Sequence, residues 1–305
     1  MAGDADAKQS AILPDELPYN PAHSEPELPA MTLRRLRLLF ALVAPLLLAH
    51  KVAAATTVLF DPGLHIGASA QGWVQACTPL FACNPFGLTG AGLLDLNTTV
   101  GANANSTQGG YFSELPSPNG AARHPGVPVL DRTTGFRLEF ALHVISESHD
   151  LNRDDNGDLK LDRAGFSIIA LSQDLFGIEL AFFANRVWAY ADATPTPGNA
   201  FTQAEFAAFD SRAGLLDYAL TISGNAYALR QGGDLLLSGA LRKYAPSGRN
   251  ALIDPYDNPS FLFFGDDTRA AQTHAQLGRI AIAPVPLPAS IALLVPPLLL
   301  LRRRH

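Results

Sequence analysis

The stretch that decides the fold begins GFRLEFALHVISES (135–148) and continues to Asp192. Its apolar residues occupy every second position, at Phe136, Leu138, Phe140, Leu142 and Val144. A period of two over about ten residues is typical of a β-strand that buries one face. The polar side chains expected on the other face are Arg137, Glu139, His143 and Glu147.

Short segments on both sides of this strand repeat the β pattern. The candidate strands are 56–60, 72–76, 93–99, 109–115, 166–170, 178–182, 187–190, three strands within 218–241, 261–267 and 275–283. Gly224-Asn225 and Gly232-Gly233 are hairpin turn pairs inside 218–241. One segment differs: FTQAEFAAFD (201–210) predicts a short helix, with Thr202 as N-cap and Glu205 at the capping-box position.

Strands of this length, with turns about every ten residues and almost no helix between them, indicate one fold class. The sequence predicts an all-β, antiparallel jelly-roll sandwich. It forms one domain over residues 56–283.

The charge distribution excludes one class of partner. The formal net charge is −6, and the three terminal segments (1–30, 31–55 and 284–305) together contribute +2, so the body between them is at −8. An acidic body without a basic patch argues against nucleic acid. It is compatible with divalent cations or neutral glycans.

The two cysteines, Cys77 and Cys83, lie close together in WVQACTPLFACNPF. In an exported protein such a pair closes a small loop as a disulfide, whereas in a cytosolic protein it remains two free thiols. The export signal described below favours the disulfide.

An acidic loop, HDLNRDDNGDLKLD (149–162), is the main candidate for chemistry. Its alternating oxygen ligands and its tight-turn glycine are what Ca²⁺ requires. The predicted ligands are Asn152, Asp154, Asn156, Asp158 and Asp162, with Glu147 or Asp266 as additional donors. In an EF-hand register Lys160 and Arg163 occupy ligand positions, so a solvated hairpin loop is the alternative. The pair Asp266-Asp267 either completes a metal site or caps a turn.

The sequence gives little support for catalysis. Glycosidases need two carboxyl groups about 5–10 Å apart, whereas Glu139 and Glu147 are separated by about 26 Å along an extended strand. No nucleophile elbow, zinc-protease motif or P-loop occurs. Aromatic residues of the strands either stack on sugars or, as is more frequent, fill the core. They are Trp73, Tyr111, Trp188 and Tyr190.

The N-terminal residues have two parts. Residues 1–30 are polar and Pro-rich. We interpret them either as disordered or as an over-extended gene prediction, with translation starting at Met31. Residues 31–55 combine arginines, an apolar run and a small-x-small site at Ala53 and Ala55, which predicts a signal peptide for the Sec translocon. A transmembrane helix is the alternative, for which the run is short.

The C-terminal segment, 284–305, has three parts in a fixed order. They are the Pro motif Val285-Pro286-Leu287-Pro288, an apolar run, and the basic cluster Arg302, Arg303 and Arg304. A single-pass anchor is one interpretation, although Pro296-Pro297 would kink its helix. The segment resembles the PEP-CTERM sorting signal of Gram-negative bacteria, with Val-Pro-Leu-Pro in place of Pro-Glu-Pro. The resemblance implies transient anchoring in the inner membrane and processing by an exosortase.

The body resembles the Y-type choice-of-anchor domains of bacterial surface proteins. The similar stretches are VPVLDRTTGFRLEFALHVISESH (127–149), DRAGFSIIALSQDLFGIELAFFANRVWAY (162–190), YALTISGNAYALRQGG (218–233) and FLFFGDDT (261–268). This resemblance implies a concanavalin A-like or laminin-G-like sandwich, at the outer surface or in the extracellular matrix. We therefore expect a non-catalytic exported protein that binds polysaccharide and Ca²⁺. The alternatives are a secreted glycan-active enzyme on the same fold and a purely structural coat protein.

Overall fold

Two long strands form the centre of the molecule. In the computed structural model, β6 (Phe136–His149) pairs antiparallel with β15 (Ala271–Pro284) along nearly their whole length. The structure describes residues 55–78, 85–100, 108–115, 123–150, 161–191, 202–244 and 254–285.

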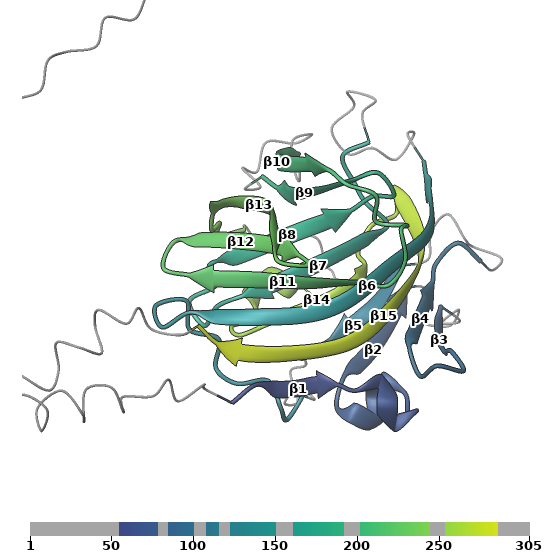
Figure 1. Cartoon of the computed structure of the whole chain (residues 1–305), viewed down its shortest axis with the longest axis horizontal. Helices are drawn as coiled ribbons and strands as arrows, with labels where there is room; N and C mark the ends of the chain where they lie inside the picture. Colours follow the sequence, from purple (N-terminus) through teal and green to yellow (C-terminus); the bar gives the residue numbers. More distant parts are fainter. Residues whose placement is uncertain are drawn as a thin grey trace, which may run out of the picture. The chain divides into compact units, whose positions relative to one another are not determined.

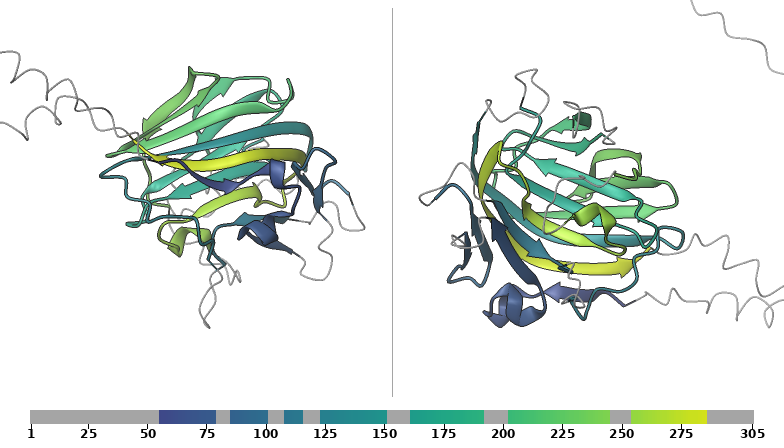
Figure 2. Two further views of the ribbon diagram at one scale, coloured as in Figure 1. Left: turned by 60° about the horizontal axis from the view of Figure 1, so that its bottom comes forward. Right: turned by 180° about the vertical axis from the view of Figure 1, so that it is seen from behind.

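The described strands form two antiparallel sheets, one in front of the other in Figure 1. The eight-stranded sheet runs β13 (Asp234–Ala240), β12 (Ala226–Gln231), β11 (Leu216–Ser223), β6, β15, β4 (Leu94–Asn97) and β3 (Phe86–Leu88), and β1 (Thr57–Phe60) also pairs with β15. The seven-stranded sheet runs β10 (Gln203–Ala208), β9 (Arg186–Tyr190), β8 (Gly177–Phe182), β7 (Phe166–Leu171), β14 (Leu262–Asp266), β5 (Gln108–Phe112) and β2 (Val74–Thr78). Figure 2 shows both layers from two further directions.

The only helical elements in the described ranges are 3₁₀ turns. They are η1 (Pro62–Leu64), η2 (Ala68–Gln71) and η5 (Pro255–Asp257). The predicted all-β, antiparallel jelly-roll sandwich is therefore confirmed. Both predicted hairpin turns are also present, since Gly224 and Gly232 have positive φ angles between the paired strands of β11, β12 and β13.

The main core lies between the two sheets, and Phe140 is near its centre. Its ring stacks on Tyr218 at 5.2 Å and meets Phe182 and Phe264 of the opposite sheet edge-on. The alternating apolar residues of β6 supply one side of this core. The period of two in the sequence thus predicted both the strand and its buried face.

The segment 201–210 is a strand, β10, and the predicted helix is wrong. Its residues pair with β9, for example Ala207 with Val187. Glu205 does not cap a helix; its carboxylate accepts hydrogen bonds from Tyr227 and Arg242 and pairs with the latter. An exposed sheet edge next to β9 outweighs the local helix signal, because edge pairing satisfies the backbone of this segment.

The prediction that Glu147 shares a face with Glu139 is also wrong. The ladder pairs Val144 with Ala275 and Ser146 with His274, so Ile145 is an extra residue. Such a bulge reverses the alternation beyond it. Glu147 consequently accepts a hydrogen bond from Ala184 N of the other sheet at 2.9 Å.

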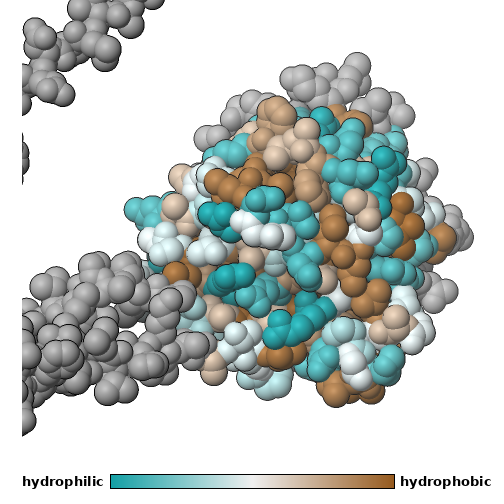
Figure 3. Space-filling view, viewed as in Figure 1, coloured by the Kyte–Doolittle hydropathy of each residue, from teal (hydrophilic) through white to brown (hydrophobic). Residues whose placement is uncertain are grey.

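Glu139, which remains on the outer face of the eight-stranded sheet, forms ion pairs with two arginines of that face. Glu139 contacts Arg137 at 3.2 Å and Arg279 at 3.6 Å. The face visible in Figure 3 accordingly interleaves hydrophilic and hydrophobic patches.

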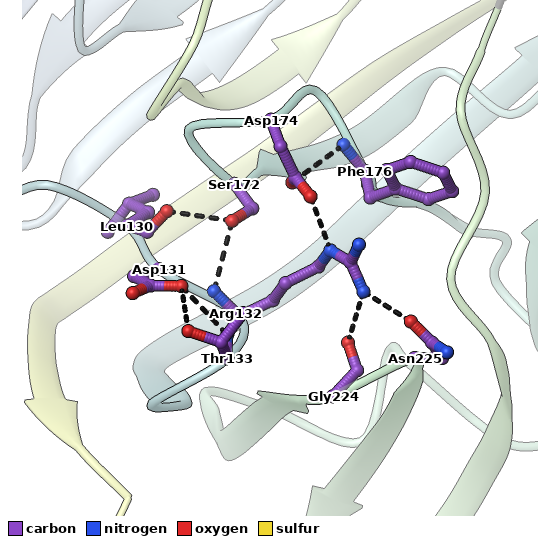
Figure 4. Close-up of polar contacts among 9 residues, drawn as sticks. All are labelled: Leu130, Asp131, Arg132, Thr133, Ser172, Asp174, Phe176, Gly224 and Asn225. Carbon is purple, nitrogen blue, oxygen red and sulfur yellow. Dashed lines mark hydrogen bonds and ion pairs between the residues drawn. The ribbon is translucent and has the colours of Figure 1, made fainter.

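Arg132 ties the ends of the two sheets together (Figure 4). Its Nε donates to Asp174, at 2.7 Å, in the turn between β7 and β8. Its Nη1 donates to the Gly224 carbonyl at 2.9 Å and to Asn225, in the hairpin between β11 and β12. The guanidinium also lies 4.5 Å from the ring centroid of Phe176. One side chain therefore joins loops that belong to opposite sheets.

We predict that Arg132→Ala lowers the free energy of unfolding by about 2 kcal/mol, because charge-assisted hydrogen bonds and a stacked ring are lost together. Urea denaturation of the purified protein measures the change. The control is Arg212→Ala, whose pair with Asp210 is exposed and should change stability by no more than about 0.5 kcal/mol. Equal effects of the two substitutions would contradict the role of Arg132.

Candidate functional site

The outer face of the seven-stranded sheet is covered, so its central strands are buried on both sides. Every residue of β7, β8 and β14 is buried. The cover comes from residues 161–164, 242–244 and 254–261. They close a second apolar cluster of Ala164, Ile169, Leu171, Ala181, Phe183, Trp188, Tyr190, Tyr244, Tyr256, Phe261 and Phe263.

The carboxyl group of Glu179 lies beneath these covering segments because side chains alternate between the two faces of β8. Ile178 and Leu180 point to the main core, which turns Glu179 to the outer face with no exposed surface. The Tyr256 hydroxyl donates a hydrogen bond to the carboxyl group of Glu179. A second carboxyl group, that of Asp267, directly follows β14 and acts on Glu179 through its charge.

Two causes favour the protonated form of Glu179. Burial raises the pKa of Glu179 well above its ordinary value of 4.5, and the negative charge of Asp267 raises it further. The Arg163 guanidinium lies 3.1 Å from Asp267 and opposes this shift. Glu179 is therefore held in its neutral form beside the ion pair of Arg163 and Asp267.

This arrangement does not match the geometry for glycoside hydrolysis. That reaction needs carboxyl groups about 5–10 Å apart with the scissile bond between them. Glu179 is sealed from solvent, and the carboxylate of Asp267 is paired with Arg163. The pair is therefore built to hold the covering segments on the sheet.

We predict that the free energy of unfolding falls as pH rises from 5 to 8, by up to about 1.4 kcal/mol per pH unit for one proton. Folded Glu179 keeps a proton that the unfolded chain releases near pH 4.5, so the stabilisation is complete at lower pH and is lost as pH rises through the raised pKa. Asp266 contributes in the same direction, because burial raises its pKa as well.

Glu179→Gln keeps a hydrogen-bond donor that does not ionise, and it should flatten this pH dependence. Urea denaturation at several pH values measures the slope. Asp210→Asn, at a side chain that is 62% exposed, is the control and should leave the slope unchanged. An unchanged slope in Glu179→Gln would exclude a proton held on Glu179.

A pocket of about 490 Å³ opens at the edge of the same sheet, where β9 meets β10. Phe206 pairs with Trp188 and Gln203 with Tyr190, so both lie on the outer face, beside the covered aromatic cluster. The lining residues are Leu161, Asp162, Arg186, Thr202, Gln203, Ala204 and Phe206.

The pocket combines an open aromatic side chain with polar groups. Phe206 is 67% exposed, more than any other large apolar residue of the described ranges. Gln203 Nε2 and Arg186 Nη2 both donate to the Leu161 carbonyl, at 2.7 and 3.2 Å. These bonds fix the amide and the guanidinium along one wall of the pocket.

Of the five predicted calcium ligands, only Asp162 is described, and it lines the pocket. Asn152, Asp154, Asn156 and Asp158 lie outside the described residues. The suggested additional donors have other partners: Glu147 accepts from Ala184 N, and Asp266 accepts from Thr98 and from Thr268 N. Within the described part of the chain, no three His, Cys, Asp or Glu side chains form a metal-binding group. The calcium site stays a prediction.

The predicted processing and disulfide residues lie mostly at the limits of the described ranges. Cys77 is disulfide-bonded, and Cys83, the other cysteine of the sequence, lies outside the described residues. Ala55 and Val285 are the first and last described residues, while Ala53, Pro286, Leu287, Pro288 and Arg302–Arg304 lie outside. Among the described residues, no helix is long and apolar enough to cross a membrane.

The aromatic residues named from the sequence are core residues, as expected. Trp73, Tyr111, Trp188 and Tyr190 are all buried, and Trp73 Nε1 donates to the Leu59 carbonyl at 3.0 Å. The residues that sequence reasoning missed are Glu179, Arg186 and Phe206. Phe206 was missed because its segment was predicted to be a helix. Glu179 could have been found from the sequence, because it is a single acidic residue in an otherwise apolar strand.

No family model matches the chain, and no curated protein matches it. Solved structures with a similar fold include a carbohydrate esterase from the Shiga toxin-encoding bacteriophage phi24B, at 14% identity over 76% of this chain and 98% of that chain, with a TM-score of 0.44. The exoplasmic/lumenal domain of VIP36, in a Ca²⁺/Man2-bound form, is 9% identical over 76% of this chain and 89% of that chain, with a TM-score of 0.43. A β-glucanase from Bacillus licheniformis is 9% identical over 77% of this chain and 100% of that chain, with a TM-score of 0.40. Likenesses at this level carry no argument about ligand or mechanism.

Proposed function

We propose that the protein is a non-catalytic, exported β-sandwich that binds polysaccharide in the pocket between β9 and β10. The observation that carries this proposal is the exposed ring of Phe206 beside the fixed polar groups of Gln203 and Arg186. A sugar ring has an apolar C–H face and a rim of hydroxyl groups. An open aromatic side chain next to anchored donors is complementary to both.

The two alternatives have less support from the described residues. A glycan-active enzyme needs two carboxyl groups on either side of an accessible bond, whereas Glu179 is sealed from solvent and Asp267 is paired with Arg163. A purely structural coat protein gives no reason for a large aromatic residue to stand 67% exposed at the mouth of a pocket.

We predict that Phe206→Ala weakens polysaccharide binding at least about fivefold, or about 1 kcal/mol, because the platform for the sugar ring is lost. A glycan array first identifies the bound polysaccharide, and calorimetric titration then measures the dissociation constant. The titration is carried out with calcium and with a chelator, since Asp162 connects the predicted calcium loop to the pocket.

The matched control is Leu235→Ala, which removes an exposed apolar side chain from β13 in the other sheet. It should leave the affinity unchanged, and neither substitution should lower the melting temperature appreciably. A protein that binds no glycan on the array would favour the structural coat protein. Equal loss of affinity in both variants would place binding elsewhere.

We also propose that the sandwich is delivered to the cell surface or the matrix by its two terminal segments. The support is the order of sequence features: a signal peptide before Thr56, and a Pro motif, an apolar run and an Arg cluster after β15. The last described residue, Val285, still contacts the domain, since its N–H donates to the Gly135 carbonyl at 3.3 Å. Val285, the first residue of the proposed Pro motif, therefore lies next to the start of β6.

We predict that the mature chain begins at Thr56 and lacks Arg302, Arg303 and Arg304 when it is produced in a bacterium with an exosortase. Intact-mass spectrometry of the exported protein reads both ends. Replacing the three arginines by serine should leave the C-terminal segment uncleaved, whereas Arg212→Ser in the body should have no effect. A mature chain that contains Asp15, or one that keeps the arginine cluster, contradicts the proposal.

A further inference from the structure

We infer that the pocket between β9 and β10 selects sugars that carry a carboxylate, and that Arg186 is the specificity-determining residue. This inference rests on the proposed function and names the class of polysaccharide, one that contains uronic acids. The carboxylate of the sugar would accept hydrogen bonds from the guanidinium of Arg186 while its ring lies near Phe206.

The guanidinium of Arg186 is held by aromatic rings rather than by an acid. Its centre lies 4.5 Å from the ring centroid of Phe183 and 5.3 Å from that of Trp188. Its Nη2 donates to a neutral acceptor, the Leu161 carbonyl. Its Nε is buried, so only the terminal nitrogens can reach a ligand. Of these, Nη1 has no hydrogen-bond partner among the described residues, so donor capacity remains unused.

The absence of a counter-charge distinguishes Arg186 from the other well-buried arginines of the described ranges. Each of those faces a carboxylate: Arg132 faces Asp174, Arg163 faces Asp267 and Arg242 faces Glu205. No carboxylate oxygen of the described residues lies within ion-pair distance of Arg186. A cation kept partly from water without a counter-charge is costly, and a carboxylate is the anion that fits its planar donors.

The rest of the pocket suits the remainder of a uronic acid. Gln203 uses its Nε2 on the Leu161 carbonyl, which leaves its carbonyl oxygen to accept from a sugar hydroxyl. Phe206 offers an apolar surface for the ring. Asp162 also lines the pocket, but it is 8% exposed and has an interaction partner already. The accessible charge of the lining is therefore that of Arg186.

The test compares pairs of oligosaccharides that differ only in the carboxyl group. Hexamers of galacturonate, glucuronate and mannuronate are titrated into the full-length exported protein, each beside its carboxyl-reduced neutral hexamer. We expect at least one uronate hexamer to bind about tenfold or more tightly than its reduced counterpart, with a difference that shrinks as salt is added. Arg186→Gln should abolish this preference. Arg186→Lys, which keeps the charge but loses the planar fork, should retain only part of it.

The outcomes separate this inference from the proposed function. If the reduced hexamers bind as tightly as the uronates and Phe206→Ala weakens both, the pocket binds sugar but the assignment to uronates is wrong. If Arg186→Gln keeps the full preference for uronate hexamers while circular dichroism shows that the variant is folded, Arg186 does not determine this specificity. A stronger preference for sulfated than for carboxylated hexamers overturns the carboxylate class. If no hexamer of either kind binds, both the inference and the proposed function fail.

Discussion

The constraint on which the rest of the structure depends is the burial of both faces of the seven-stranded sheet. An antiparallel sheet commonly leaves one face to water, and its strands then alternate. Here β7, β8 and β14 are buried at every position. Segments without regular structure must therefore lie on the outer face, and each polar group beneath them must find a partner there. Tyr244 illustrates this, since its hydroxyl accepts from Glu179 N and donates to the Tyr190 carbonyl.

The raised pKa of Glu179 follows from the same constraint. A buried carboxylate beside the charge of Asp267 would be strongly destabilising, and protonation of Glu179 removes that charge. The result links three parts of the chain: Tyr256 on one covering segment, Glu179 in β8, and Arg163 on the other covering segment. Because Leu161 and Asp162 directly precede Arg163, the buried cluster also positions one wall of the edge pocket. The cover and the pocket are consequently parts of one arrangement.

Prediction from the sequence succeeded where local pattern and tertiary environment agreed. The alternation in β6 identified a strand and its buried face, and the Gly-containing turns identified the hairpins of β11 to β13. It failed where long-range pairing decided the outcome. The segment 201–210 has a capping signal, yet it pairs with β9 at a sheet edge. Beyond the bulge at Ile145 the period of two continues in the sequence, but the side chains point the opposite way.

The sequence by itself determined the class of fold, the central strand β6 with its buried face, and the hairpins of β11 to β13, because each of these depends on neighbouring residues. Only the tertiary structure decided which side chains meet. Glu179 and Asp267 are 88 residues apart in the sequence, and Arg186 and Phe206 come together only because β9 and β10 pair. Which polar groups share a buried face, and which aromatic residue remains open, depends on how the sheets are covered, and no local pattern encodes that.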